Sequence, residues 1–173
     1  MLFRSELEGS KVKVASVATA FPSGMSTKKI KIDETRFAVN EGADEIDMVI
    51  NIIALKAGDW NYLKNELTSA ATIVQLRGGK LKVILETGLL TDAEIIKACE
   101  LCKEMTVDFV KTSTGFAQPG ATLEAVKLLR ANLPKSIKIK ASGGVRTKEF
   151  ALQLIEAGAD RLGCSASVSI ISE

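Results

Sequence analysis

Histidine is absent from the 173-residue sequence, and this absence excludes more chemistry than any other feature of the composition. Without an imidazole there can be no Ser-His-Asp or Cys-His catalysis, no histidine-ligated zinc or iron, and no acid–base step carried by histidine. Any catalysis must therefore use lysine, carboxylate or hydroxyl groups.

Proline and cysteine are scarce, with three residues of each. The few prolines, with 46% hydrophobic and 25% charged residues, exclude a disordered, collagen-like or mucin-like chain and indicate a single domain over residues 1–173. An odd number of cysteines favours a reducing compartment over a disulfide scaffold. Cys99 and Cys102 have the spacing of a redox dithiol, but they lie inside an expected helix, so we favour helix packing as their role.

The net charge is small, with 23 Lys and Arg residues against 21 Asp and Glu residues. A net charge of +2 gives no basic field of the kind that attracts nucleic acid. The N-terminal residues carry charges at Arg4, Glu6 and Glu8 without an apolar run, so we expect neither a secretion signal nor a membrane span. These features predict a cytoplasmic protein that binds a small molecule, not nucleic acid or a membrane.

Short apolar segments alternate with segments of helical length, which is the pattern of βα units in a parallel sheet. Strands are expected at 11–17, 45–50, 81–86, 108–112, 137–142 and 161–164. Helices are expected at 28–41, 60–76, 92–104, 122–132 and 148–157. Expected N-caps are Thr91, Thr122 and Thr147, and expected C′ glycines are Gly42 and Gly158. The pattern indicates an α/β fold, either a doubly wound sheet or part of a (β/α)₈ barrel.

A lysine stands near the end of the apolar strand expected at 108–112, where a charged side chain is rarely tolerated. Lys111 either extends into water at the strand end or is a desolvated, neutral amine able to form a Schiff base. The next strand alternates so that Lys138, Lys140 and Ser142 share one face. A cationic Lys140 beside Lys111 would disfavour protonation of Lys111 and so activate it, whereas Lys138 is expected at the solvated rim.

Two carboxylates stand in expected strands. Asp47 lies on the face opposite Ile46 and Met48, where an unpaired carboxylate is costly. It is either one partner of a structural ion pair or a proton-transfer group paired with a lysine. Glu86 precedes Thr87 and Gly88, and this position is equally compatible with lining a site and with forming a turn.

Turns rich in glycine and serine follow the last three expected strands, at 113–115, 142–146 and 163–166. Glycine lets backbone N–H groups approach an anion, and a short helix after Ser165 would add the positive end of its dipole. Each turn alone is an ordinary βα connection. Together they resemble the phosphate site that barrels place after their late strands.

Four segments together resemble the deoxyribose-phosphate aldolase family: EIDMVIN at 45–51, KVILETG at 82–88, FVKTSTG at 109–115 and KASGGVR at 140–146. The resemblance covers essentially the whole chain and implies a (β/α)₈ TIM barrel. It also implies a class I (Schiff-base) aldolase, a lyase that needs no cofactor or metal. Such an enzyme reversibly cleaves 2-deoxy-D-ribose 5-phosphate to D-glyceraldehyde 3-phosphate and acetaldehyde in deoxyribonucleotide and carbohydrate degradation.

The same resemblance assigns the roles of individual residues. Lys111 becomes the Schiff-base lysine, Lys140 the lysine that tunes it, and Asp47 the proton-transfer carboxylate. The substrate phosphate is expected at Gly115, Gly143, Gly144, Ser165 and Ala166, and the residues expected to line the site are Glu86, Thr112 and Ser142. Many members have a serine where this chain has Ala166, so only the backbone N–H can donate a hydrogen bond there.

The resemblance begins within the helix that precedes the family's third strand, which implies an incomplete barrel with about six of eight strands. Because open strand edges invite pairing, a homo-oligomer could cover them. One alternative is therefore a truncated or degenerate aldolase fragment without activity, acting if at all as a structural or interaction protein. Another is a phosphate-binding barrel isomerase or epimerase, which explains the glycine turns but gives Lys111 and Lys140 no role.

Overall fold

The computed structural model describes residues 2–105 and 107–172. The chain divides into two compact units, Met1–Val83 and Ile84–Glu173, and each is described by itself. Strands and helices alternate in both units, as the sequence predicts. The single domain expected from the sequence stays a prediction.

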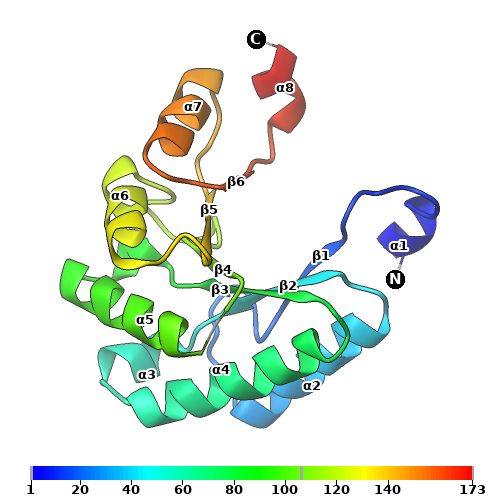
Figure 1. The fold of residues 1–173 in the computed structure, drawn as a ribbon, viewed down its shortest axis with the longest axis vertical. Helices are drawn as coiled ribbons and strands as arrows, with labels where there is room; N and C mark the ends of the chain where they lie inside the picture. The colour runs from blue at the N-terminus through cyan, green and yellow to red at the C-terminus, as the bar shows by residue number, and fades with distance from the viewer. Residues whose placement is uncertain (1, 106, 173) are drawn as a thin grey trace. The chain divides into compact units, whose positions relative to one another are not determined.

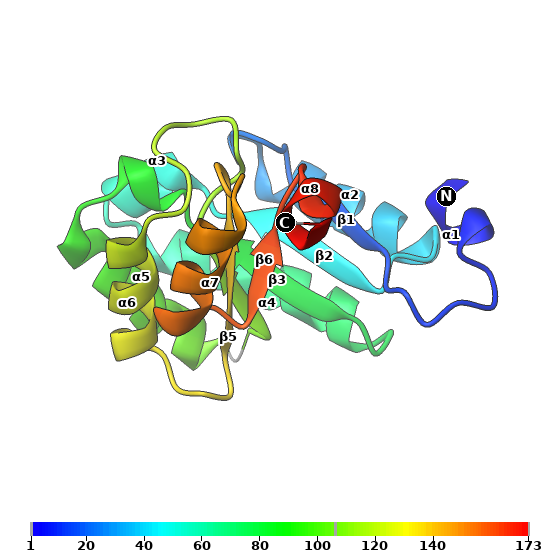
Figure 2. The same ribbon diagram turned by 90° about the horizontal axis from the view of Figure 1, so that it is seen from above.

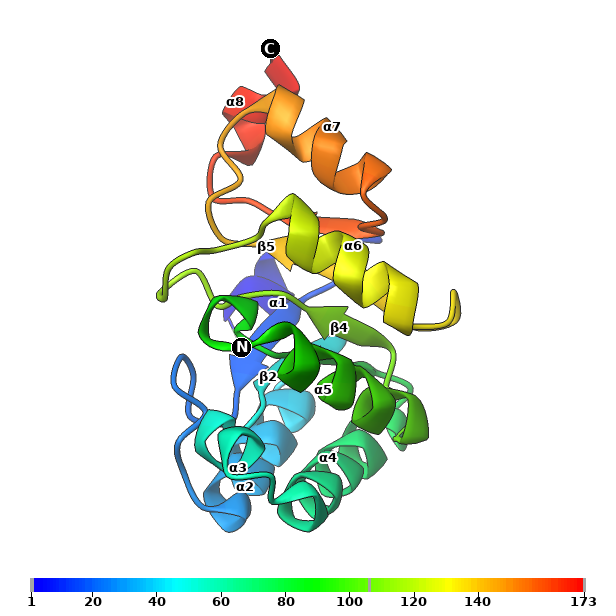
Figure 3. The same ribbon diagram turned by 90° about the vertical axis from the view of Figure 1, so that its left-hand side faces the viewer.

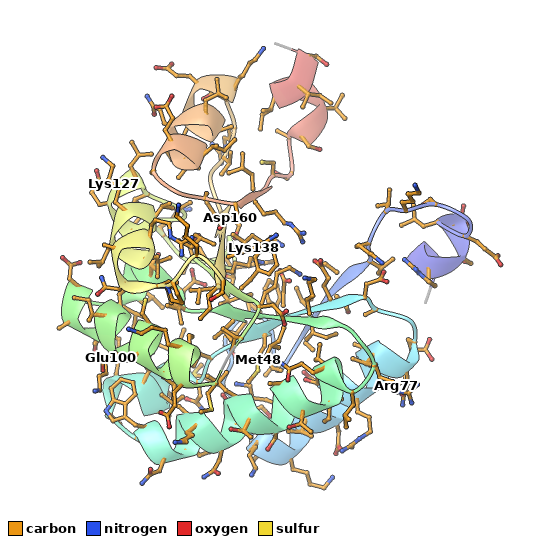
Figure 4. All side chains as sticks on the ribbon, viewed as in Figure 1. Met48, Arg77, Glu100, Lys127, Lys138 and Asp160 are labelled. Atoms are coloured by element: carbon orange, nitrogen blue, oxygen red, sulfur yellow. The ribbon has the colours of Figure 1, made fainter. Side chains whose placement is uncertain are left out.

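The first unit contains three strands with helices between them (Figure 1). Its elements are α1 (Leu2–Glu6), β1 (Ala15–Ala18), α2 (Lys28–Asn40), β2 (Glu45–Val49), α3 (Ile52–Lys56), α4 (Trp60–Gln75) and β3 (Lys80–Ile84), whose last residue belongs to the second unit. β1 and β2 pair in parallel, and α2 packs against α4. β2 is buried along its whole length, and Met48, labelled in Figure 4, is fully buried in it.

A buried ion pair joins the two long helices of this unit. Lys31 Nζ on α2 lies 2.8 Å from Glu66 Oε1 on α4 and also donates a 2.8 Å hydrogen bond to the Val49 carbonyl. Both charged side chains are fully buried. Burial lowers the pKa of Lys31 and raises the pKa of Glu66, while their mutual attraction opposes both shifts.

The predicted first strand was wrong at its start, because residues 11–14 form no strand and β1 begins at Ala15. The reason is that a side chain takes the place of a neighbouring strand at this point. Asp44 Oδ2 accepts a 2.8 Å hydrogen bond from the Val14 N–H, and the carbonyl of Val14 accepts from the N–H groups of Asp44 and Glu45. Regular pairing therefore starts one residue later.

The second unit also contains parallel strands alternating with helices. Its elements are η1 (Thr87–Leu89), α5 (Asp92–Glu104), β4 (Phe109–Lys111), α6 (Leu123–Asn132), β5 (Lys138–Ser142), α7 (Lys148–Glu156), β6 (Arg161–Gly163) and α8 (Ser167–Ser172). β5 pairs with β4 on one side and with β6 on the other. α6 packs against α5 (Figure 2) and α7 (Figure 3), and Lys127 on α6 and Glu100 on α5 are exposed (Figure 4).

The helix ends follow the predicted signals. Thr91, Thr122 and Thr147 each accept a hydrogen bond at a helix N-terminus, and Thr91 forms a complete capping box. Gly42 and Gly158 have φ angles of +93° and +114°, which glycine adopts without strain.

Short helices were predicted less well than long ones. The helix expected after Ser165 is present as α8, but α1, α3 and η1 were not expected. Each of these three has five residues or fewer, which is too short to show a helical period in the sequence. Among the described residues, every helix is too short or too polar to cross a lipid bilayer.

Candidate active site

Two lysines stand side by side at the carboxyl ends of neighbouring strands in the second unit. Lys111 is the last residue of β4, and its Cα is paired in register with that of Lys140 in β5. Lys111 is only 6% exposed, so its side chain does not extend into water, and Lys140 is half-buried. The alternation that predicted this pairing is confirmed, as is the exposed position of Lys138, labelled in Figure 4.

Both lysines line one cavity of about 480 Å³. The cavity's other lining residues lie at the ends of β5 and β6 and in the loops after β4, β5 and β6; they are Thr114, Gly115, Phe116, Ser142, Gly143, Gly144, Val145, Arg146, Gly163, Cys164 and Ser165. The structure thus brings together both predicted lysines, Ser142 and four of the five predicted phosphate-binding residues. Ala166 follows directly after the last lining residue.

Glycine makes room for Lys140 in this cavity. A Cβ atom on Gly163 would lie 3.2 Å from Lys140 Cε and 2.8 Å from Ser142 Cβ. A side chain at position 163 would therefore clash with Ser142 and crowd the end of the Lys140 side chain. Gly115, Gly143 and Gly144 have φ angles between +78° and +94°, so the turns that line the cavity depend on glycine.

Thr112 and Ser142 tie the ends of β4 and β5 together. Thr112 Oγ1 donates to the Ser142 carbonyl and accepts from the Ser142 N–H, both at 3.1 Å. Ser142 Oγ donates a 2.6 Å hydrogen bond to the carbonyl of Ser113. Thr112 is fully buried and supports the cavity from behind, so it is not one of the residues that line it.

Glu86 likewise lies behind the cavity. It is 2% exposed, and its carboxylate accepts hydrogen bonds from the backbone N–H of Thr114 at 3.1 Å and from Thr114 Oγ1 at 2.5 Å. Because Thr114 lines the cavity, Glu86 holds one of its walls. From the sequence, Glu86 could either line the site or form a turn. Its hydrogen bonds to Thr114 fit the second alternative.

Asp47, in the first unit, belongs to a buried charged group on β2 and β3. Lys82 Nζ lies 2.9 Å from Asp47 Oδ1 and 2.5 Å from Glu45 Oε2, and all three side chains are less than 5% exposed. The ion pair foreseen for Asp47 is confirmed. Its proton-transfer role stays a prediction.

The sequence reasoning missed the part that Lys82 and Glu45 play, although one signal was available. Lys82 interrupts the apolar run of β3, and Lys111 ends the apolar run of β4. A lysine in such a strand needs an acidic partner or a chemical role.

Gly120 supports the cavity without lining it, and the sequence reasoning missed this role. It lies against the turn after β5, where its added Cβ atom would stand 2.4 Å from the Gly143 carbonyl oxygen. The neighbouring Ala121 N–H donates a 2.9 Å hydrogen bond to the same oxygen. The loop after β4 is thereby fixed to the glycine turn that lines the cavity.

Gly120→Ala is therefore expected to lower the free energy of unfolding by about 1–3 kcal/mol, since backbone atoms must move to admit the methyl group. Gly144→Ala is the matched control, because its Cβ atom meets nothing within 4 Å and the change adds only backbone strain at φ +78°. Urea unfolding followed by circular dichroism measures both. A smaller loss for Gly120→Ala than for Gly144→Ala would contradict the close approach.

Cys99 and Cys102 lie buried in α5, which agrees with a packing role. Burial raises the pKa of the Cys99 thiol to about 12 and also raises the pKa of Cys102. A redox dithiol needs an accessible thiolate, which these residues do not supply at neutral pH.

Alkylation with iodoacetamide at pH 8 is accordingly expected to modify Cys164, which is half-buried in the cavity wall, well before Cys99 or Cys102. Peptide mass spectrometry over a time course gives the order of labelling, and labelling in urea shows that all three thiols can react. Early modification of Cys99 or Cys102 would restore the redox interpretation.

The cavity combines the parts needed for imine chemistry on an anionic aldehyde. A buried lysine can attack a carbonyl, a neighbouring lysine supplies positive charge, and three glycine-containing loops offer backbone N–H groups. Within residues 2–105 and 107–172, no cluster of three or more Cys, Asp or Glu side chains is arranged to hold a metal ion.

Comparisons with known proteins agree with this arrangement. Residues 8–166 match the DeoC/LacD family aldolases. The chain is 51% identical to deoxyribose-phosphate aldolase of Thermococcus kodakarensis over 92% of this chain and 71% of that protein. It is 48% identical to the enzyme of the same name from Clostridium tetani, over 99% of this chain and 79% of that protein.

Solved structures show the same fold. QR15, an aldolase, superimposes with a TM-score of 0.90 at 42% identity, covering 98% of this chain and 77% of that one. The tetrameric deoxyribose phosphate aldolase from Aeropyrum pernix superimposes with a TM-score of 0.85 at 30% identity, covering 93% of this chain and 67% of that one. The predicted α/β fold of the barrel type is confirmed, and the chain belongs to the DeoC/LacD family of aldolases.

Proposed function

We propose that this chain is a class I deoxyribose-phosphate aldolase with Lys111 as its Schiff-base residue. The main support for this proposal is that Lys111 is buried and is paired in register with Lys140, in a cavity bounded by glycine turns. Phosphate capture is assigned to Gly115, Gly143, Gly144, Ser165 and Ala166, in the turns after β4, β5 and β6.

The reaction begins when the neutral Lys111 amine adds to the C1 aldehyde of 2-deoxy-D-ribose 5-phosphate. Loss of water from the carbinolamine gives an iminium ion that withdraws electrons from C2. The C2–C3 bond then breaks as the C3 hydroxyl loses its proton, which releases glyceraldehyde 3-phosphate and leaves an enamine on Lys111. Protonation at C2 and hydrolysis of the resulting iminium release acetaldehyde and restore the amine.

Lys140 and Asp47 are assigned to the proton steps of this cycle. Lys140 is the proposed tuning lysine: it supplies positive charge beside Lys111 and stabilises the anionic oxygen that forms on the carbinolamine. Asp47, held by Lys82 in the first unit, is the proposed carboxylate for proton transfer.

Borohydride trapping tests the proposal. Incubating the protein with acetaldehyde or deoxyribose 5-phosphate and sodium borohydride should fix a secondary amine on Lys111, which peptide mass spectrometry locates, while a coupled assay records glyceraldehyde 3-phosphate. An adduct on Lys111 with turnover supports the aldolase. A folded protein without an adduct or product would favour the inactive-fragment alternative.

The assembly state and location also stay predictions. The Aeropyrum pernix aldolase is described as tetrameric, and we propose that this chain also forms a homo-oligomer. Sedimentation equilibrium over a hundredfold concentration range would show it as a mass above 18.5 kDa. The cytoplasmic location rests on the sequence composition and on the phosphosugar and acetaldehyde proposed as ligands.

A further inference from the structure

Glu86 combines burial, charge and an unusual backbone conformation. It stands at the carboxyl end of β3, within the second unit, with φ 57° and ψ 60°. This left-handed region is uncommon for residues other than glycine and asparagine, and such positions gather where a precise local geometry is needed. Glu86 is also only 2% exposed. A charged, buried residue in a strained conformation needs strong contacts to remain there.

Two backbone hydrogen bonds fix Glu86 against the strand that carries Lys111. The Leu85 N–H donates to the Lys111 carbonyl at 3.0 Å, and the Thr87 N–H donates to the Thr112 carbonyl at 2.9 Å. The residues on both sides of Glu86 are thus bound to Lys111 and its successor. The backbone of Glu86, from which the carboxylate extends, is therefore held in a fixed position relative to Lys111, the candidate nucleophile.

From this point the carboxylate reaches the turn after β4. Glu86 accepts from the N–H and the hydroxyl of Thr114, and the same hydroxyl accepts a 3.1 Å hydrogen bond from the Phe116 N–H. The carboxylate therefore contacts Thr114 directly and Phe116 through the Thr114 hydroxyl, and Gly115 lies between these two residues in the chain. All three line the cavity that contains Lys111.

We infer that Glu86 is a positioning residue, which holds the turn formed by Thr114, Gly115 and Phe116 in the shape that receives the phosphoryl group of the substrate. The inference rests on the proposed function and assigns to that site a residue that does not itself touch the ligand. Its physical basis is pre-organisation: N–H groups bind an anion well only when they are held in place before it arrives. Because Thr114 donates two hydrogen bonds to the carboxylate of Glu86, the charge of Glu86 stabilises the loop and does not contact the ligand.

The test separates phosphorylated from non-phosphorylated substrate. Glu86→Gln keeps the size of the side chain but loses the charge-assisted hydrogen bonds, and Thr114→Val keeps the shape but loses the hydroxyl. Each is expected to raise KM for deoxyribose 5-phosphate about tenfold while kcat/KM for unphosphorylated deoxyribose stays within about twofold. The effect of the double variant should be smaller than the product of the two single effects, since each change disrupts the same hydrogen bond between the Thr114 hydroxyl and the Glu86 carboxylate.

Two controls exclude a general loss of stability. Thr114→Ser retains the hydroxyl that Thr114→Val removes, so its KM for deoxyribose 5-phosphate should stay close to that of the wild type. Glu66→Gln removes a buried charge in the first unit, so it should lower stability without changing the ratio of the two substrates. Equal losses on both substrates, additive effects in the double variant, or the same change of ratio in Glu66→Gln would each overturn the inference.

A titration with inorganic phosphate tests this inference independently of the proposed function. Titration followed by ³¹P NMR is expected to show about tenfold weaker binding to Glu86→Gln than to the wild type. If the wild type forms no imine with acetaldehyde, the proposed function fails. The phosphate titration then decides alone: weaker binding supports the role of Glu86, and unchanged binding overturns it.

Discussion

Lys111→Leu is expected to lower turnover of deoxyribose 5-phosphate by about 10⁴-fold or more, as is typical when a covalent nucleophile is removed. Leucine fits the buried position, where the wild-type side chain is 6% exposed, so the variant should remain folded. Without the amine no iminium can form, and without the iminium no group withdraws electrons from the bond that breaks. The checks are the rate of glyceraldehyde 3-phosphate release and the loss of the borohydride adduct.

The neighbouring strand supplies graded controls for this prediction. Lys140→Met should lower kcat by about 10²–10³-fold, because the positive charge that stabilises the carbinolamine oxygen and assists proton transfer beside Lys111 is lost. Lys138→Met, two residues earlier and exposed, should leave turnover within about twofold. An adduct on Lys138 or Lys140, or equal small losses in all three variants, would contradict the assignment of Lys111.

The pairing of Lys111 with Lys140 was predictable because it depends on local alternation. In a strand, side chains two residues apart share a face, and neighbouring parallel strands present their carboxyl ends at the same edge. Those two rules suffice to bring the lysines and the glycine turns together once the strands are recognised. The long helices and their threonine caps follow from equally local patterns.

Contacts between distant segments were not predictable in the same way. Glu86 meets Thr114 across 28 positions, and Lys82 meets Asp47 across 35. Such contacts depend on strand register and on which way a loop turns, and no periodicity in the sequence encodes either. The start of β1 was misjudged for the same reason, because it depends on the side chain of Asp44, 30 positions from Val14.

Lys82→Met is expected to lower the free energy of unfolding by about 3–5 kcal/mol, the range for breaking a buried ion pair by removing one partner. Lys82 is the shared cation of two carboxylates, Glu45 and Asp47, which are 3% and 2% exposed. Methionine fills a similar volume, so the loss reports the missing charge more than a cavity. Urea unfolding monitored by circular dichroism gives the value.

Two further variants isolate the charge in this prediction. Lys80→Met, on the same strand but exposed, should change stability by less than about 0.5 kcal/mol. Adding Glu45→Gln and Asp47→Asn to Lys82→Met should recover much of the loss, because neutral amides cost less to bury than unpaired carboxylates. A loss in Lys82→Met as small as in Lys80→Met would contradict the ion pairs.

The same variants separate the two roles of Asp47, as an ion-pair partner and as the proposed proton-transfer group. Asp47→Asn leaves Lys82 paired with Glu45, so its cost in stability should be smaller than that of Lys82→Met. Its cost in turnover should be larger than any effect on phosphate binding, because an amide cannot exchange a proton with the substrate. If Asp47→Asn instead reduced stability and left turnover unchanged, Asp47 would be a structural partner of Lys82 alone, and the proton steps would have to be carried by Lys140 and water.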